Sequence, residues 1–286
     1  MKRLLATLFV CLLLAPASGR AGSATQSAST PKDAASTPEA KIAELFGATP
    51  GAFVLYDRNA DRFVRHNAAR CAVRASPFST FKVPNSLVGL ESGVIKDADF
   101  VIPWDKKKYP ADEAFLPEWN RDHDLRSAIQ YSVVWYYREL ALRVGKAPMN
   151  RYVEAMNYGN RDTSGPLDGF WLNSSIKISP DEQIAFLRAL YDEKLPFSKR
   201  SMKIVKDILP SEKIGAATIR GKTGTGRIDG ELWLGWYVGW VETGDNVVFF
   251  ALQMDSPDVQ TLMPLRKTTT KKILSALGYL PGAAAS

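Results

Sequence analysis

The chain contains little histidine, and this scarcity excludes several common kinds of active site. Only His66 and His123 occur among the 286 residues. No G-x-S-x-G sequence accompanies them, so a Ser-His-Asp triad is not expected. Two histidines also argue against a zinc site. A nucleophile in this chain therefore needs a base other than imidazole.

Cysteine is equally scarce, since only Cys11 and Cys71 are present. Cys11 lies inside an apolar run near the first residue, and Val10 before it is too large for a lipoprotein cleavage site. Cys71 would then have no partner for an internal disulfide. We expect it to be a small buried apolar residue rather than a catalytic thiol.

Long apolar runs are limited to one, from Leu4 to Leu14. Lys2 and Arg3 precede it and small residues follow, which is the order of a secretory signal peptide. The run is also too short to cross a bilayer comfortably. We expect a signal peptide at residues 1–21, a flexible linker at 22–40 that is rich in Ser, Ala, Thr and Pro, and a folded domain at 41–283. This predicts a periplasmic protein without a membrane segment after cleavage.

The charge gives no sign of a polyanionic partner. The formal net charge is +7, and loss of the three basic residues in the signal segment leaves +4. No stripe of Lys and Arg is present, so nucleic acid binding is not expected. The short basic run at 106–108 is interpreted as a solvated loop.

The hydrophobic pattern changes period along the chain and predicts an α+β fold. We expect a short helix at 39–47 and a largely helical middle from 77 to 209, in which Ser179 caps a helix that has Pro180 as its first residue. An antiparallel sheet formed from both chain ends would pack against this middle region, in one domain. The expected strands are 51–57, 62–67, 217–224, 232–242 and 246–255, the long helices are 127–145 and 179–195, and the closing helix is 265–277.

Ser79 and Lys82 form an S-x-x-K sequence ahead of an apolar stretch. Residues i and i+3 share one helix face, so Ser79 Oγ and Lys82 Nζ can meet. Lysine acts as a base only where burial depresses its pKa, and the neighbours Phe81, Val83 and Leu87 are apolar, as this requires. The pattern alone is common, and an ordinary amphipathic helix explains it equally well.

A second pattern, RGKTGTG at residues 220–226, begins within the strand predicted at 217–224, where that strand is expected to run to an exposed edge. Lys222 and Thr223 would present a cation and a hydroxyl to a ligand carboxylate, and Gly224 would let the ligand's backbone approach the strand. Alone, this is also a plain glycine-rich turn. S-x-x-K followed by K-T-G is, however, the signature of serine β-lactamases and penicillin-binding proteins, and here the two patterns occur in that order about 140 residues apart.

The residues between these two patterns narrow the resemblance. In Ser132-Val133-Val134, a valine stands where class A enzymes and most penicillin-binding proteins carry asparagine. With Tyr158-Gly159-Asn160 and the pair Trp171-Leu172, the set resembles the class D β-lactamases, the oxacillinases. The resemblance extends from about Thr49 to the end of the chain, and GWYVGWVE and MPLRKTTTKKIL are similar to that family's closing strands and helix.

The resemblance implies that Ser79 opens the β-lactam amide of penicillin-type antibiotics to form an acyl-enzyme. Lys82 would be carboxylated on Nζ by carbon dioxide or bicarbonate and act as the base for acylation and deacylation, without a metal. Ser132 would relay a proton to the lactam nitrogen. The resemblance also implies an oxyanion hole formed by the backbone N–H groups of Ser79 and Thr225, and binding of the substrate carboxylate by Lys222, Thr223, Gly224 and Arg266. The carboxylated lysine would lie in a pocket of Phe81, Val134, Trp171 and Leu172, where the Trp171 indole N–H would donate a hydrogen bond to the carbamate. Tyr158, Gly159 and Asn160 would shape a wall of the site.

Two other functions share many of these residues. A penicillin-binding transpeptidase or carboxypeptidase would use Ser79, Lys82 and the K-T-G strand but would hold its acyl-enzyme for long periods, and Val134 and Trp171-Leu172 argue against it. A β-lactam sensor domain would follow several membrane spans and a metalloprotease, which this sequence does not contain. The expected partner is a small β-lactam, and the protein would be a monomer or a homodimer. Thr225 stands where this family often has a bulky aromatic residue, so the substrate range stays open.

Overall fold

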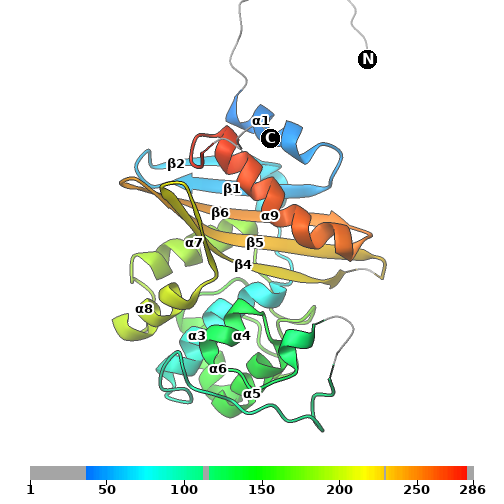
Figure 1. Cartoon of the computed structure of the whole chain (residues 1–286), viewed down its shortest axis with the longest axis vertical. Coiled ribbons are helices and arrows are strands. Elements are labelled where there is room, and N and C mark those ends of the chain that lie inside the picture. Colours follow the sequence, from blue (N-terminus) through cyan, green and yellow to red (C-terminus); the bar gives the residue numbers. More distant parts are fainter. Residues whose placement is uncertain (1–36, 112–115, 229, 282–286) are drawn as a thin grey trace, which may run out of the picture. The chain divides into compact units, whose positions relative to one another are not determined.

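The described residues form a six-stranded antiparallel sheet with the strand order β2-β1-β6-β5-β4-β3 (Figure 1). The computed structural model describes residues 37–111, 116–228 and 230–281. Strand β1 pairs with β2 on one side and with the last strand, β6, on the other, so the sheet joins both ends of the chain, as predicted. The strands are β1 Gly51–Asp57, β2 Arg62–His66, β3 Ser211–Ile214, β4 Ala217–Ile228, β5 Leu232–Thr243 and β6 Asn246–Ser256.

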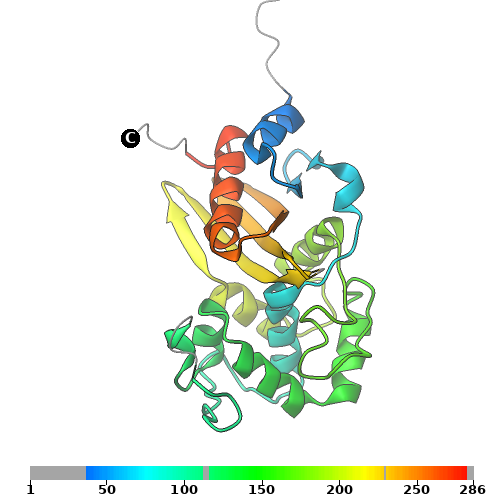
Figure 2. The same ribbon diagram turned by 90° about the vertical axis from the view of Figure 1, so that its right-hand side faces the viewer.

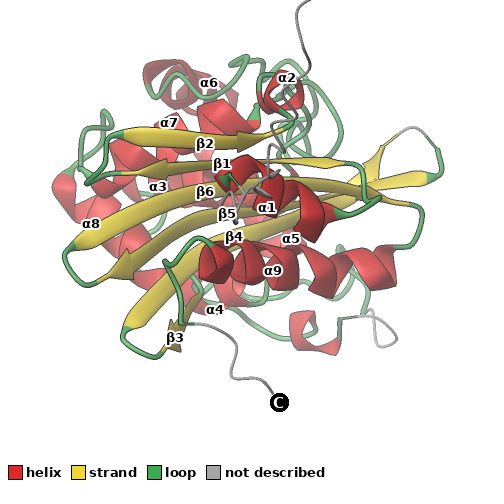
Figure 3. Cartoon of the chain, turned by 90° about the horizontal axis from the view of Figure 1, so that it is seen from above, coloured by secondary structure: helices red, strands yellow, loops and turns green. Residues whose placement is uncertain are grey.

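Helices cover both faces of this sheet (Figures 2 and 3). Helices α1 (Pro38–Phe46) and α9 (Val259–Ala276) lie over one face, and α7 (Pro180–Tyr191) packs on the other, against β1 and β6. The other helical segments are α2 Ala68–Cys71, η1 Phe78–Phe81, α3 Lys82–Glu91, η2 Pro117–Trp119, α4 Leu125–Gln130, α5 Val134–Val144, α6 Lys146–Ala155 and α8 Lys199–Ile208.

The central strands are buried on both faces, because each face has its own hydrophobic core. Along β1, Phe53 and Leu55 face the core under α1 and α9, whereas Val54 and Tyr56 face the core of the helical region. Every residue of β1 is buried. This two-sided burial explains why these strands read as continuous apolar runs rather than alternating ones.

Most predicted elements are confirmed, with differences at particular boundaries. Ser179 caps α7 in a capping box with Glu182, and Pro180 begins that helix. The first helix begins at Pro38, three residues before the predicted domain start at 41, because Thr37 caps it. Residues 1–36, which contain the predicted signal peptide and most of the linker, lie outside the described residues.

Three features differ from the prediction. The single helix expected at 127–145 is broken into α4 and α5, because Ser132 between them adopts a left-handed φ of 57°. Helix α9 begins at Val259 rather than 265, since Asp258 caps it and Pro264 is tolerated inside it. Strand β3 was not predicted, because its exposed residues carry no apolar alternation.

Candidate active site

Ser79 and Lys82 lie where two helical segments join. The 3-10 helix η1 ends at Phe81, and α3 begins at Lys82 with Pro84 in its first turn, where a missing N–H costs no helix hydrogen bond. Lys82 Nζ donates a hydrogen bond of 2.7 Å to Ser79 Oγ. The predicted i, i+3 spacing therefore brings the amine to the hydroxyl.

The Lys82 side chain is completely buried, and this changes its protonation. Desolvation lowers the pKa of Lys82 to about 7, because burial penalises the charged ammonium. The Tyr137 ring lies 5.4 Å from Nζ, and the Tyr137 hydroxyl forms a 2.9 Å hydrogen bond with Ser86 Oγ. Near neutral pH, a large share of the lysine is thus a neutral amine, able to take a proton or attack an electrophile.

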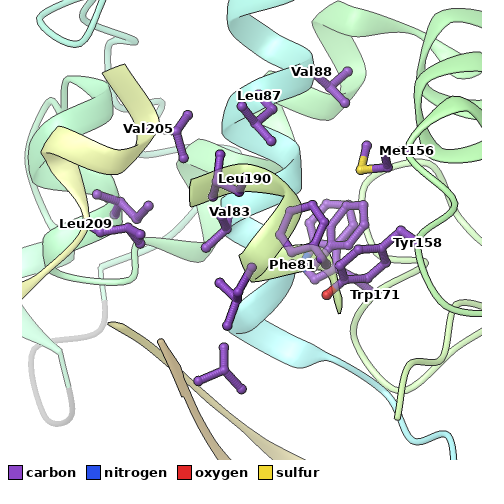
Figure 4. Close-up of a cluster of buried hydrophobic side chains, with 14 of the residues drawn as sticks. Phe81, Val83, Leu87, Val88, Met156, Tyr158, Trp171, Leu190, Val205 and Leu209 are labelled. Carbon is purple, nitrogen blue, oxygen red and sulfur yellow. The ribbon is translucent and has the colours of Figure 1, made fainter. Parts of the chain in front are cut away.

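Trp171 packs against Phe81, the residue that precedes this lysine, and has an unused donor. Its indole stacks on the Phe81 ring, with centroids 5.5 Å apart, and Tyr158 lies against the same phenyl ring (Figure 4). The Trp171 carbonyl accepts a 3.1 Å hydrogen bond from Phe78 N, which ties it to η1. Its indole Nε1 is buried and has no hydrogen-bond partner among the described residues. A buried N–H of this kind fits an anionic acceptor formed next to it.

Ser132 and Lys222 form a second hydroxyl–amine pair. Lys222 Nζ donates hydrogen bonds of 3.0 Å to Ser132 Oγ and to its neighbour's carbonyl, Thr223 O. Lys222 is 2 % exposed, and burial together with the nearby charges of Lys82 and Arg266 lowers its pKa. The left-handed backbone of Ser132 is what places its hydroxyl here, at the break between α4 and α5.

A cavity of about 260 Å³ opens beside Ser79. Its polar wall contains Ser79, Ser132, Thr223, Thr225 and Arg266, which come from four separate segments of the chain. Val134 and Gly224 also line it. Lys222 lies behind Ser132 rather than on the wall. The remaining wall is largely apolar and was not identified from the sequence: Leu116, Trp119, Tyr131, Trp233, Val259 and Met263.

Arg266 is buried, although an exposed surface position is the usual one for arginine. Its guanidinium donates to Gly224 O at 2.6 Å, to Met263 O at 3.1 Å and to Thr225 Oγ1. Burial lowers the pKa of Arg266 to about 10, so it stays a cation near neutral pH. The residue thus presents a fixed positive charge at the end of the cavity next to β4.

Gly224 also has a packing role, which the sequence did not reveal. A Cβ at this position would lie 2.8 Å from Pro77 O and 3.2 Å from Thr80 N. The missing side chain therefore lets η1 pack directly on β4. Gly224 also lines the cavity, where the sequence suggested space for a ligand backbone. From Lys222 onward β4 pairs only with β5, so the predicted open edge of this strand is confirmed.

The other residues predicted to belong to the site differ in how far they are buried. Phe81 is fully buried, while Leu172 and Val134 are partly buried. Tyr158 contacts the Phe81 ring edge-on, whereas Asn160 donates a hydrogen bond to the backbone of Ser175 and does not line the cavity. Cys71 is buried, and its pKa is raised to about 12 by burial, as expected of a structural cysteine.

Within the described parts of the chain, no group of three or more His, Cys, Asp or Glu side chains is placed to hold a metal ion. Over the same residues, no helix has both the length and the apolar character needed to cross a bilayer.

Comparisons with known proteins agree with this geometry. The penicillin binding protein transpeptidase domain profile matches residues 12–275. β-Lactamase OXA-48 of Klebsiella pneumoniae is 44% identical over 232 residues, which are 81% of this chain and 84% of that protein. Regulatory protein BlaR1 of Bacillus licheniformis is 39% identical over 204 residues, which cover 71% of this chain but 33% of BlaR1.

A solved structure shows the same fold. The class D β-lactamase YbXI from Nostoc superposes with a TM-score of 0.78 at 37% identity, covering 84% of this chain and 99% of that one. The profile match, the identity to OXA-48 and this superposition extend over most of the chain. The chain therefore belongs to the class D β-lactamases, a family of serine hydrolases with the penicillin-binding transpeptidase fold.

Proposed function

We propose that the protein hydrolyses the β-lactam amide of penicillin-type antibiotics through an acyl-enzyme on Ser79, with N-carboxylated Lys82 as the general base. The 2.7 Å hydrogen bond between a fully buried lysine amine and a serine hydroxyl carries this proposal. An imidazole base has no candidate nearby, because His66 belongs to β2 and the two ring nitrogens of His123 contact Ser127 and Glu118.

Lys82 and its surroundings fit carboxylation. The reaction with CO2 requires a neutral amine, and burial supplies one by lowering the lysine pKa to about 7. The product is an anion that an apolar pocket would penalise without a donor. The unpartnered Trp171 Nε1 is such a donor. Once formed, the carboxylated side chain supplies a base for the Ser79 proton and later for the hydrolytic water.

Ser79 and Ser132 would share the bond-making and bond-breaking steps. Ser79 Oγ loses its proton as it forms a bond to the lactam carbonyl carbon. Backbone N–H groups of Ser79 and Thr225 would hold the resulting oxyanion, and each donor would contribute about 3 kcal/mol. As the carbon–nitrogen bond breaks, Ser132 would give its proton to the leaving nitrogen. Lys222, 3.0 Å from Ser132 Oγ, would replace that proton.

Substrate binding would use the cation at the end of the cavity. Arg266 and Thr223 line the wall and would bind the carboxylate of the β-lactam. Gly224 contributes its backbone. Lys222 would not contact this carboxylate directly, because the Ser132 side chain lies between Lys222 and the cavity. Its positive charge would attract the carboxylate from behind Ser132.

We also propose that residues 1–21 direct secretion to the periplasm and are removed, that residues 22 to about 37 form a flexible linker, and that the domain then acts without a membrane anchor, as a monomer or a homodimer. The order of charged, apolar and small residues at the start of the sequence supports this.

The decisive experiment is hydrolysis of a chromogenic cephalosporin by the purified protein, combined with mass spectrometry of the intact chain. We expect sustained turnover and a transient acyl adduct located at Ser79. A single stoichiometric burst without turnover would contradict the hydrolase assignment and favour a sensor, to which the similarity with BlaR1 would then point. Turnover that survives Ser79→Ala would contradict the proposed nucleophile.

A further inference from the structure

A second cavity, of about 270 Å³, adjoins the catalytic one. Trp119 and Val134 line both cavities and so form a shared wall. The second cavity lies between the segment 104–110, η2 and the first turns of α5. None of the roles proposed above uses it.

Aromatic rings in fixed positions form most of this second cavity. The indole N–H of Trp104 donates to Tyr109 O at 2.9 Å, that of Trp119 to Tyr131 O at 2.9 Å, and that of Trp135 to Trp119 O at 2.8 Å. Because backbone carbonyls satisfy all three donors, the rings are held in place and offer only apolar surface to the cavity. Such a preorganised surface suits a flat ring.

The charges at this cavity are not balanced. Lys108 forms an ion pair with Glu139, and that carboxylate also accepts a 2.7 Å hydrogen bond from the Tyr109 hydroxyl. Among the described residues, Arg138 has only a long ionic contact of 3.8 Å to Asp168, with both side chains more than a third exposed, so this pair contributes little. Arg138 Nε is buried without a hydrogen-bond partner among the described residues. Within the part of the chain that the structure describes, Arg138 is therefore a cation with an unused donor.

We propose that this second cavity binds a planar aromatic carboxylate, with the ring against Trp104, Trp119 and Trp135 and the carboxylate on the Arg138 guanidinium. Guanidinium–carboxylate pairing supplies the charge and the geometry, and the indoles supply the apolar contact. Because Trp119 and Val134 also line the catalytic cavity, a ligand here changes hydrolysis without occupying the place of the β-lactam. The inhibition is therefore mixed rather than competitive.

The test uses 2-naphthoate as the probe, with binding followed by tryptophan fluorescence and inhibition followed with a chromogenic cephalosporin. We expect saturable quenching and mixed inhibition. Arg138→Gln should weaken binding by about tenfold, because it removes a charged hydrogen bond, and should leave kcat/KM without the probe unchanged. Arg143→Gln, on the same helix but exposed, is the matched control and should bind as the intact protein does. The uncharged 2-naphthamide should bind about tenfold more weakly.

A competing site for the same probe is Arg266 in the catalytic cavity. Strictly competitive inhibition that Arg266→Gln weakens and Arg138→Gln leaves unchanged would overturn the proposal, as would the absence of any quenching or inhibition. If Arg138→Gln does not fold, Trp104→Leu replaces it with the same expected loss of binding. Fluorescence needs no turnover, so the binding result stands even if the hydrolytic mechanism proposed for Ser79 and Lys82 fails.

Discussion

Lys82 shows how a single side chain acquires its chemistry from its surroundings. Lysine and serine are common residues, and the sequence S-x-x-K occurs by chance in many proteins that have no catalytic function. Here the Lys82 side chain is fully buried and its only hydrogen bond from Nζ in the described structure goes to Ser79 Oγ. Burial therefore converts an ordinary surface cation into a base.

This leads to a prediction about pH. The pKa of Lys82 is lowered to about 7, so the ammonium form, which neither takes a proton nor reacts with CO2, dominates below that pH. We expect kcat/KM to fall as pH drops through about 7 and added bicarbonate to restore part of the loss. Carbon-13 NMR with labelled bicarbonate should show a carbamate signal that disappears over the same range. A carbamate signal that persists unchanged in Lys82→Met would contradict this assignment.

Trp171 gives a second prediction at this scale. Trp171→Phe keeps a ring against Phe81 but removes the unpartnered indole N–H. We expect a folded protein in which deacylation slows by about tenfold or more, since a buried charge loses a donor. Acyl-enzyme would then accumulate in mass spectra. Trp240→Phe is the matched control, because its indole N–H is also buried and unpartnered but lies at another cavity; an equal effect there would remove Trp171 from the mechanism.

The sequence could group candidate site residues that lie close together along the chain, but not those that only the fold brings together. Ser79 and Lys82 are three residues apart, and Lys222 and Thr223 lie in one short pattern, so both pairs were found. Trp119 and Trp233 line the same cavity from distant segments. Each is an ordinary aromatic residue in the sequence, and only the packing of η2 and β5 around Ser79 reveals their position.

At the scale of elements, the contact between η1 and β4 positions the nucleophile. Ser79 belongs to η1, which lies on β4 because Gly224 and Gly226 carry no side chain; a Cβ on Gly226 would overlap the Phe78 ring at 1.9 Å. Phe78 itself has a positive φ of 47°, so the turn into η1 is strained where it meets the strand. The two glycines thus serve protein packing first.

Gly224→Ala tests this contact. The added Cβ would press on Pro77 O at 2.8 Å and push η1 away from the strand. We expect a loss of about 1–3 kcal/mol in the free energy of unfolding and a larger proportional loss of kcat/KM, because Ser79 moves with η1. Denaturant titration and initial rates measure the two effects. Gly169→Ala, where nothing lies within 4 Å of an added Cβ, should change neither; a harmless Gly224→Ala would show that the contact is loose.

The break between α4 and α5 marks the limit of prediction for elements. Apolar residues continue at helical spacing through residues 127–145, so the period gives no signal of an interruption. The left-handed conformation of Ser132 depends on tertiary contacts, including the 3.0 Å hydrogen bond from Lys222. Strand β4, which carries Lys222 and lies about 90 residues later in the sequence, therefore supports the conformation at this break.

At the scale of the whole molecule, the described residues from Thr37 onward form one unit that includes α1. Ile42 and Phe46 of α1 are buried under α9 and the sheet, at 0% and 3% exposure. A protein beginning at Ser36 should keep the stability and turnover of the longer chain. Phe46→Ala should lower the free energy of unfolding by about 3 kcal/mol or more, since it opens a cavity in that core.

Thermal and urea unfolding of both proteins test this prediction. Loss of turnover in the shortened protein would mean that residues before 36 contribute to the folded domain. An unchanged unfolding free energy in Phe46→Ala would mean that α1 is only loosely attached, in disagreement with its burial.

In the sheet, strand β6 lies between β1, which is synthesised early, and β5, which is synthesised late. This order of strands has a consequence for biogenesis. While the ribosome is still producing the polypeptide, the first hairpin has no neighbour on its open side until β6 is made, and the K-T-G residues of β4 have no partner until β5 is made. The catalytic centre can be completed only after translation has passed β6. The polypeptide therefore becomes an enzyme only after β6 and the helix α9, which carries Arg266, have been synthesised.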